Sequence, residues 1–425
     1  MLKKVLIIAY YFPPMGGSGV QRPAKLAKYL RKFGWEPVIL APEPGAYISF
    51  DESLLLELKE LNIRIERVKP NTPFHKSGKS KKKVSSSPFK EKLVKWLTSW
   101  FFLPDNKRGW VEPAVAKAIE LHASESFDAI LATAPPYSNC LIAQTIKKKI
   151  GLPVLLDFRD DWLKSHWIWY PTSWHYRKMK KIEQKALMSA DAISVVNPMY
   201  KSSFEERLAK GKQIDVRVIP NGFDPEDYNQ ATPSGSDKRF TILHSGRFYN
   251  VIQPDTLLKS VKLAIDKQPE LQSCLSLQFQ GGLGRRHWSL INKLGLEIVT
   301  TDFGYVEHGQ AVKNITNADL LYLTLGERKH MNAVTPGKLF EYMGSLKPVL
   351  AHIPEGVTAD YLRKYNAASI IALNDEVSGA QEILNFYEKW KRNNLPVGDE
   401  KFATRFSRLK IAEQFSGLLS QIVHH

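Results

Sequence analysis

A short segment in the C-terminal half of the chain reads Thr335-Pro336-Gly337-Lys338-Leu339-Phe340-Glu341-Tyr342-Met343-Gly344. Proline at this position favours the first turn of a helix, where free backbone N–H groups and the positive end of the helix dipole attract an anion. Lys338 can add a positive charge for a diphosphate, and Glu341 lies on the same helical face and can accept hydrogen bonds from ribose hydroxyls. A solvated Lys–Glu pair without a ligand is the alternative.

A second informative segment lies at the N-terminus. Lys4–Ala9 is a short apolar run typical of a buried parallel strand, and a helical pattern follows from Val20 to Phe33. Between them, Gly16-Gly17-Ser18-Gly19 permits a left-handed backbone and the close approach of a phosphate or sugar. A turn with only a structural role would have the same glycines.

A dinucleotide-binding dehydrogenase is a rival interpretation of this strand, turn and helix. The third glycine of the dehydrogenase fingerprint is missing, because Val20-Gln21-Arg22 follows the turn. The next predicted strand, 36–40, ends in Ala41-Pro42 and has no acidic residue for a ribose. Both features argue against this class.

Three further segments lie between these ends in a recognisable order. Asp215–Asp224 contains a strand and a turn, 240–243 leads into His244-Ser245-Gly246-Arg247, and 275–279 leads into Gln280-Gly281-Gly282-Leu283-Gly284. Together with the two segments above, this order resembles the GT-B retaining glycosyltransferases of family 4 (glycosyl transferases group 1). That family includes sucrose synthases and bacterial enzymes of polysaccharide or glycolipid assembly.

The resemblance implies an α/β fold of two Rossmann-like, doubly wound domains that face each other across a cleft. The expected acceptor domain spans 1–220, the nucleotide-sugar donor domain spans 221–395, and a C-terminal helix over 400–425 packs back on the first domain. Strands are expected near Val5, Val38, Arg64, Ile130, Val154, Ile193, Val216, Ile242, Leu277, Ile298, Leu320, Val349 and Ile370.

The resemblance also implies roles for individual residues. Arg247 and Lys338 stabilise the departing diphosphate, since a fixed guanidinium can meet its growing negative charge with two hydrogen bonds. Asp160 orients the acceptor hydroxyl and completes the expected catalytic set. The expected donor-binding residues are Gly16, Gly17, Ser18, Gly19, Arg247, Gly282, Thr335, Pro336, Lys338, Leu339 and Glu341.

Two positions depart from the family pattern. Ala333 stands where many members have a second glutamate that approaches the donor sugar, so Glu327 is a nearby candidate for this contact, with an exposed loop acid as the alternative. Val251-Ile252-Gln253-Pro254 replaces the Lys-Gly pair that often grips the diphosphate. Lys338 is then expected to serve alone.

The acceptor side is expected at the end of the strand Val154–Leu156, which runs into Asp157-Phe158-Arg159-Asp160-Asp161-Trp162. Ligands gather at the carboxyl ends of strands in open parallel sheets. Arg159 is expected to hold an anionic acceptor or to support the loop, with a local salt-bridge network as the alternative. Trp162 is expected to line the acceptor site, together with the aromatic residues of 167–174.

Composition agrees with a two-domain enzyme. The 425 residues are 43% hydrophobic, enough for two cores, and no apolar run is long enough for a transmembrane helix or a signal peptide. Cys140 and Cys274 form no disulfide or metal pattern, and the histidines have no closely spaced ligand pair apart from the terminal His424-His425. We expect no metal and no cofactor besides the donor, a UDP- or GDP-sugar, and a cytoplasmic location.

The net charge of +17 is concentrated in one region. Residues 75–108 contain ten Lys or Arg and two acids, and this mixture of lysines and aromatic residues is typical of a helix on an anionic membrane. A core-facing apolar side with solvated lysines is the alternative. No nucleic-acid-binding module accompanies the charge. The predicted membrane contacts, at the inner face of the plasma membrane, are Lys92, Lys95, Trp96, Trp100 and Phe101.

The leading hypothesis is a metal-independent retaining hexosyltransferase that moves a sugar from a nucleoside diphosphate to a saccharide or lipid-linked acceptor. The alternative is a non-catalytic protein of the same fold that binds a membrane or an assembly partner. A sugar-nucleotide epimerase of the same shape is a third possibility.

Overall fold

The computed structural model describes residues 2–45, 49–71, 100–165, 168–208, 213–229, 239–249 and 251–424. The chain forms two compact units. The first contains Met1–Asn221 and Arg408–His425, and the second contains Gly222–Ser407. Each unit is built around its own parallel sheet with helices on both faces, which is the α/β plan expected from the sequence.

The first sheet has the strand order β3-β2-β1-β4-β5-β6-β7, and its neighbouring strands pair in parallel. Its strands are β1 Lys3–Ile8, β2 Trp35–Pro42, β3 Arg64–Val68, β4 Ala129–Ala134, β5 Val154–Phe158, β6 Ala192–Val195 and β7 Asp215–Val218. The strand order reverses between β1 and β4. The carboxyl ends of these two strands are therefore the place where a doubly wound sheet binds ligands.

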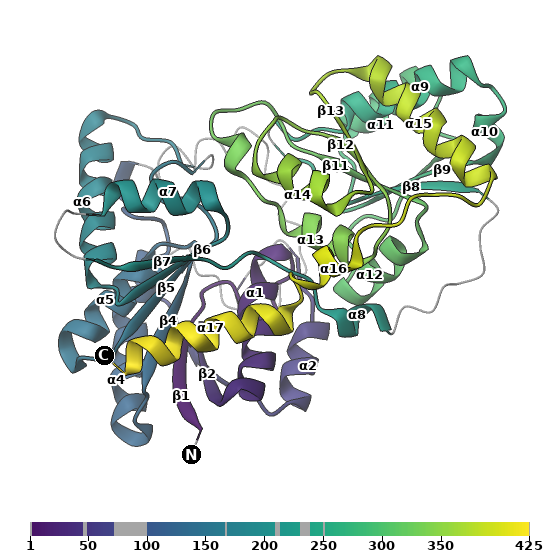
Figure 1. The fold of residues 1–425 in the computed structure, drawn as a ribbon. Coiled ribbons are helices and arrows are strands. Elements are labelled where there is room, and N and C mark those ends of the chain that lie inside the picture. Colours follow the sequence, from purple (N-terminus) through teal and green to yellow (C-terminus); the bar gives the residue numbers. More distant parts are fainter. Residues whose placement is uncertain are drawn as a thin grey trace. The chain divides into compact units, whose positions relative to one another are not determined.

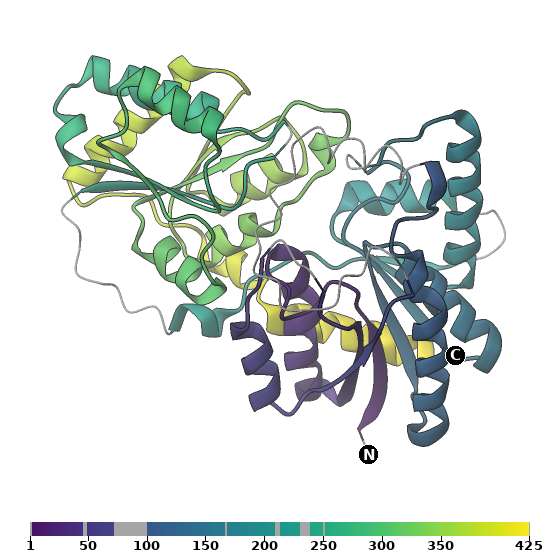
Figure 2. The ribbon, with the colours of Figure 1, turned by 180° about the vertical axis from the view of Figure 1, so that it is seen from behind.

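Helices cover both faces of the first sheet. They are α1 Ser18–Leu30, α2 Ser53–Glu60, α4 Val111–Glu125, α5 Ser138–Ile150, α6 Ser173–Ser189, α7 Pro198–Arg207 and α17 Arg408–Val423, with 3-10 turns η1 Arg31–Phe33 and η2 Arg108–Trp110. The C-terminal α17 packs beside α1, and its Phe415 and Ile411 belong to the same hydrophobic core as Leu30 and Val5. Figures 1 and 2 show α17 on one side of this sheet and α4 on the other.

The second sheet repeats the plan with the order β10-β9-β8-β11-β12-β13. Its strands are β8 Phe240–Ser245, β9 Leu275–Gln280, β10 Thr300–Asp302, β11 Leu320–Thr324, β12 Val349–His352 and β13 Ala368–Ile371. Along β11, Leu320 and Tyr322 belong to one core while Leu321 and Leu323 belong to the other. This alternation is the period of two that a strand buried on both faces must have.

Helices also alternate with the strands of the second sheet. They are α8 Pro225–Asn229, α9 Asp255–Lys267, α10 Leu271–Cys274, α11 Arg285–Leu294, α12 His308–Asn317, α13 Gly337–Gly344, α14 Val357–Tyr365, α15 Glu376–Lys391 and α16 Glu400–Thr404, with the 3-10 turn η3 Met331–Ala333. Strand order here reverses between β8 and β11. The turn after β8 is therefore the expected ligand position in this unit.

Two expectations differ from the structure. The strand expected near Ile298 begins at Thr300, and Ile298 itself is 78% exposed. The single helix expected over 400–425 is two helices, because Phe402 and Phe406 pack into the second unit whereas α17 packs into the first. No helix among the residues that the structure describes is long and apolar enough to span a bilayer.

Candidate functional site

Two tight turns meet at the carboxyl ends of β8 and β9. The Gly246 N–H donates to the Gln280 carbonyl at 2.7 Å, and both Gly246 (φ 118°) and Gly281 (φ 131°) have the positive φ that favours glycine. A Cβ built on Gly281 would lie 2.4 Å from the Gly246 carbonyl carbon. The two turns therefore pack backbone against backbone, and only glycine fits at Gly281.

Lys338 reaches this turn from the first turn of α13. Its Nζ lies 3.1 Å from Nε2 of His244, and a Cβ built on Gly246 would lie 2.7 Å from the same Nζ. The ammonium is thus placed directly over the glycine turn. Burial lowers the pKa of Lys338 to about 8, and the nearby Glu341 carboxylate opposes this shift.

His244 is held on three sides. Its Nδ1 lies 3.0 Å from the Tyr322 carbonyl oxygen, and its ring stacks on Phe248 with centroids 4.3 Å apart. Burial and the charge of Lys338 lower the pKa of His244 well below its ordinary value, so the imidazole is neutral at pH 7. Because Nδ1 must donate to the carbonyl, Nε2 is the acceptor and the lysine is the donor.

Helix α13 is tied to the sheet by Tyr342. The Tyr342 hydroxyl accepts from the Ser245 N–H at 2.8 Å and donates to the Tyr322 carbonyl at 3.2 Å. The first N–H groups of a helix have no partner within its ladder, and in α13 that of Leu339 donates to the Pro336 carbonyl at 3.1 Å. Since the tyrosine fixes the helix against β8 and β11, these N–H groups and the Lys338 ammonium have a rigid support.

The remaining donor residues lie around this arrangement. Arg247 is exposed, and its guanidinium has no carboxylate partner in the part of the chain that the structure describes. Glu341 is half-buried, and its carbonyl accepts from the Tyr228 hydroxyl at 2.6 Å. Gly282 (φ 92°) has open space where a Cβ would stand. The other expected donor-binding residues, Thr335, Pro336 and Leu339, lie at the start of α13. The side chains of Thr335 and Leu339 are buried there.

The departures from the family pattern also have places in the structure. Ala333 is buried in η3, and Glu327 is exposed in the loop that follows β11. Val251 packs against that loop so closely that a Cβ on Gly326 would lie 2.3 Å from its carbonyl oxygen. The residues that replace the Lys-Gly pair therefore support the loop after β11.

The glycine-rich turn of the first unit follows β1. Gly17 (φ 103°) is exposed with no atom within 4 Å of a built Cβ, and the Gly16 N–H donates to the Ser49 carbonyl at 2.9 Å. The Gly19 carbonyl accepts from Nη1 of Arg159. The side chain of Ser18 lies outside the part that the structure describes. Gly17 thus leaves open space beside the turn.

Arg159 has a supporting role in this structure. Its guanidinium donates to the carbonyls of Gly19, Pro135 and, at 3.4 Å, Ala134, so it joins the turn after β1 to the loop after β4. Burial lowers its pKa. Of the two roles considered for Arg159, the geometry supports the one in which it holds the loop.

Asp160 lies at the same edge of the sheet as Tyr11, which was not among the expected site residues. Burial raises the pKa of Asp160, Arg159 opposes this, and Asp161 adds to it. Burial also raises the pKa of Tyr11 to about 12, with Asp105 and Asp160 adding to the shift. Tyr11 and Asp105 are therefore further polar groups on the expected acceptor side.

Asp105 has a fixed position at the start of α5. Its carboxylate accepts from the Ser138 N–H at 2.9 Å and from the Ser138 hydroxyl at 2.6 Å. Lys107, two residues on, lies 5.2 Å from the ring of Tyr10, and burial lowers its pKa. In the sequence, Asp105 and Lys107 simply follow a run of aromatic residues. That pattern does not predict that they lie near the residues after β1.

Trp162 does not line an open acceptor site, because its side chain is buried. The side chain is 0% exposed, its ring stacks on Tyr137 at 4.6 Å, and its indole N–H points to the sulfur of Met179 at 3.3 Å. Trp162 is a core residue here, because the short loop after β5 folds it inward. Among the other aromatic residues considered, Trp169 and Trp174 are exposed.

The predicted membrane contacts are described only in part. Lys92, Lys95 and Trp96 lie outside the described residues, whereas Trp100 is 38% and Phe101 is 77% exposed. Trp100 is held near α6, since its carbonyl oxygen lies 3.3 Å from Nε2 of His175 and the two rings are in edge contact at 5.1 Å.

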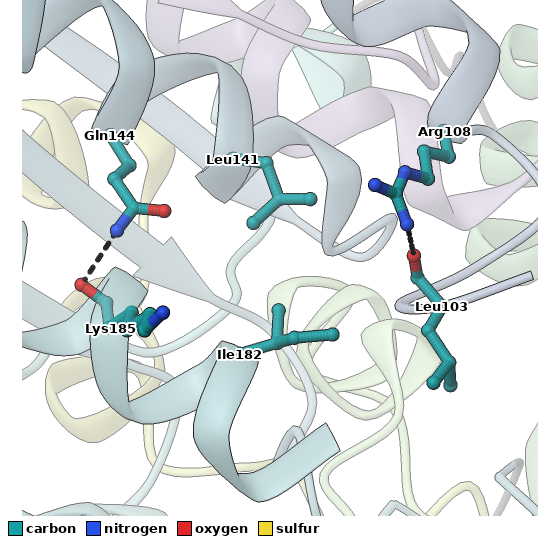
Figure 3. A pocket seen from close by; sticks show the side chains of 6 residues that line it. All are labelled: Leu103, Arg108, Leu141, Gln144, Ile182 and Lys185. Carbon is teal, nitrogen blue, oxygen red and sulfur yellow. Dashed lines mark hydrogen bonds between the residues drawn. The ribbon is translucent and has the colours of Figure 1, made fainter. Parts of the chain in front are cut away.

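A small pocket of about 190 Å³ opens in the helix layer of the first unit (Figure 3). Leu103, Arg108, Leu141, Gln144, Ile182 and Lys185 line it. The Gln144 amide donates to the Lys185 carbonyl at 3.1 Å across one end of it. None of the expected site residues lines this pocket, so it is separate from the strand ends described above.

Comparisons with known proteins support the fold described above. Over 99% of the chain, the fold matches the whole of HepE from Anabaena, solved with UDP and glucose, with a TM-score of 0.67 and 16% identity. It also matches 99% of sucrose-phosphate synthase from Thermosynechococcus elongatus, with a TM-score of 0.67 and 15% identity over 99% of this chain. No curated protein matches the chain by sequence. The chain therefore has the GT-B glycosyltransferase fold.

The family follows from the first unit. Residues 16–222, just under half of the chain, match the glycosyl transferase 4-like domain. A third solved structure, TarM from S. aureus in complex with fondaparinux, α-GlcNAc-glycerol and UDP, shares the fold with a TM-score of 0.61 and 10% identity. It covers 98% of this chain and 100% of its own. The expected GT-B, family 4-like assignment is confirmed.

Proposed function

We propose that the protein is a glycosyltransferase that moves a sugar from a nucleoside diphosphate to a saccharide or lipid-linked acceptor. The observation that carries this proposal is the Lys338 ammonium placed over the Gly246 turn, at the switch point of the second sheet. A cation, free helix N–H groups and a glycine turn at one strand end form a site suited to a diphosphate. The UDP found in HepE makes a UDP-sugar the first donor to test.

In this proposal the protein supplies positive charge without a metal. As the bond between the sugar and the diphosphate breaks, negative charge grows on the β-phosphate, where Lys338 and the exposed Arg247 can stabilise it. Glu341 accepts hydrogen bonds from ribose. In the retaining reaction that the family resemblance implies, the acceptor oxygen forms its bond on the same face of the sugar, and its proton passes to the departing phosphate. Asp160 orients that acceptor.

The acceptor side of this proposal rests on the first unit. Asp160 and Tyr11 follow the carboxyl ends of β5 and β1, and they are close enough for Asp160 to raise the pKa of Tyr11. Aromatic and carboxylate groups suit a sugar, because aromatic rings pack on its C–H faces and carboxylates accept from its hydroxyls. These features favour an acceptor with sugar hydroxyls.

We also place the reaction at an anionic membrane surface, on the inner face of the plasma membrane. The α6 patch supports this location, and it comprises Trp174, Arg177, Lys178, Lys181 and Lys185, all exposed. Trp174, Lys178, Lys181 and Lys185 follow helical spacing along one stripe, and the Lys178 ammonium lies 4.6 Å from the Trp174 ring. The acid of α6, Glu183, is buried on the other side.

The membrane location is tested by sedimentation with vesicles. Binding to phosphatidylglycerol vesicles is expected, with little binding to phosphatidylcholine and a decrease at high salt. Exchange of Lys178 and Lys181 for glutamine should weaken binding about 30-fold, at about 1 kcal/mol for each lysine. The matched control exchanges Lys259 and Lys262 of α9. Equal binding to neutral vesicles, or equal loss in the control, would contradict this location.

The catalytic proposal is tested by incubation of purified protein with UDP-glucose, UDP-N-acetylglucosamine and GDP-mannose in EDTA. Release of nucleoside diphosphate is expected with one of these donors, and Lys338→Ala and Arg247→Ala should each slow it. Recovery of an altered donor sugar without release would indicate an epimerase. No reaction with any donor would favour a non-catalytic protein, as would unchanged turnover in both variants.

A further inference from the structure

His244 contacts Lys338 but was not among the expected site residues. It occupies the next-to-last position of β8, two residues before the Gly246 turn, and it is completely buried. We infer that His244 is a positioning residue for the donor diphosphate, because its neutral imidazole accepts a hydrogen bond from the Lys338 ammonium and holds it over the turn. This inference rests on the proposed function of the site.

The direction of the hydrogen bond is fixed by the backbone. The Tyr322 carbonyl at 3.0 Å requires a proton on Nδ1 of His244, which leaves Nε2 as an acceptor 3.1 Å from the lysine. The stacked Phe248 ring prevents the imidazole from turning over. The tautomer and the ring plane are therefore set before any ligand binds, and the lysine is aimed by a rigid group.

A neutral acceptor suits this task better than a carboxylate. An ammonium has three N–H donors, so one bond to His244 leaves two for phosphate oxygens. A carboxylate in the same place would neutralise the charge and compete with the diphosphate. In the described part of the chain Lys338 has no carboxylate within ion-pair distance, although Glu341 is near enough to raise its pKa. The imidazole thus orients the lysine and leaves its charge available.

Two substitutions separate the two bonds of the imidazole. His244→Gln keeps an amide oxygen near the position of Nε2, where it can accept from Lys338. His244→Asn keeps an amide N–H near the position of Nδ1, where it can donate to the Tyr322 carbonyl, but it has no acceptor for the lysine. If His244 acts through Lys338, the two variants differ in ligand binding. If it only fills space, neither variant should change how UDP affinity depends on pH.

The experiment is a calorimetric titration of UDP into the full-length wild type and both variants, from pH 7 to 9. We expect the asparagine variant to bind UDP about 10-fold more weakly at pH 7, the loss of one charge-assisted hydrogen bond. Its affinity should also begin to fall at a lower pH than in the wild type, because the ammonium has lost an acceptor. The glutamine variant should keep both properties close to those of the wild type.

Other titratable groups near this site are shared by all three proteins. They are Glu341 and Tyr342 on α13, Tyr322 on β11 and Arg247 after β8. A difference between variants therefore reports on the His244 to Lys338 bond. Equal affinities and equal pH profiles in the two variants would overturn the inference, as would loss in the glutamine variant alone. Absence of UDP binding in the wild type would instead overturn the proposed UDP-sugar site.

If the asparagine variant does not fold, Lys338→Met is compared in the wild-type, His244→Gln and His244→Leu backgrounds, because leucine fills the site without an acceptor. Removal of the lysine should lower UDP affinity by the same factor in the wild-type and glutamine backgrounds, and by a smaller factor in the leucine background. The same factor in all three backgrounds, or a smaller factor in the glutamine background, would contradict the role assigned to Nε2. Thermal unfolding of each variant monitors its fold.

Discussion

The charge of Lys338 should make nucleotide binding depend on pH. With a pKa of about 8, the free site carries a protonated lysine in about 0.9 of the molecules at pH 7 and about 0.1 at pH 9. If the diphosphate binds only the ammonium form, its affinity falls about 10-fold over this interval. Bound phosphate raises the pKa of the lysine, so binding takes up a proton.

The assay is calorimetric titration of UDP in two buffers of different ionisation enthalpy between pH 7 and 9. Lys338→Met is the control, because it removes the charge and keeps most of the apolar stem, so its affinity should be lower and nearly constant over this range. Any titration of the uracil base appears equally in both proteins. An affinity that is constant with pH in the wild type, or a parallel decline in both, would refute the role of the ammonium.

The same pKa has an opposite effect on the free protein. Because the folded-state pKa of Lys338 is below its ordinary value, the unfolded chain binds more protons above pH 8, and folding stability from this group rises with pH. Relative to Lys338→Met, the ligand-free wild type should therefore become more stable between pH 8 and 10, while its stabilisation by UDP decreases. Urea unfolding with and without UDP measures both trends, and trends of the same sign would contradict the reasoning.

Three further predictions concern the framework of the site. Gly281→Ala should cost about 2–4 kcal/mol of unfolding free energy by urea titration, because its Cβ meets the Gly246 backbone, whereas the control Gly282→Ala adds only positive-φ strain of about 1 kcal/mol. Asp157→Asn should cost about 3–5 kcal/mol, since it breaks the buried pair with Arg22 at 2.8 Å. The pKa of Asp157 is lowered, so its stabilisation is present above the ordinary carboxyl pKa and decreases as pH falls, and the variant should lose this acid dependence. Asp160→Asn should leave UDP affinity unchanged and slow transfer, and a change in UDP affinity would contradict its acceptor role.

Most strands could be predicted because buried parallel strands are continuous apolar runs, as in Val5–Ile8. The exception is β10 at the sheet edge, because its Thr-Thr-Asp sequence contains no apolar residue. The strand was therefore predicted near Ile298, which is exposed. The break before α17 was also missed. Apolar residues continue through it, and only tertiary packing assigns Phe406 to one unit and Ile411 to the other.

The site could be predicted only where one segment contains its chemistry. Lys338 and the glycine turns could be named as candidates because a helix start and a turn have local sequence patterns. His244 was not found as a ligand of Lys338, since the two residues are 94 positions apart and meet only through the order of β8 and β11. Trp162 was misplaced for a related reason: an aromatic residue after a strand can turn either outward or into the core.

The central claim is that the second unit binds a nucleoside diphosphate without a metal. Its most direct test is thermal unfolding of the wild type and of Lys338→Met with UDP, GDP, ADP, CMP and TDP in the presence of EDTA. A nucleotide at 100 times its Kd should add about 2.7 kcal/mol of stability. The account predicts stabilisation of the wild type by one diphosphate, UDP first, and a smaller effect in the variant. No stabilisation by any of the five, or equal stabilisation of both proteins, would contradict it.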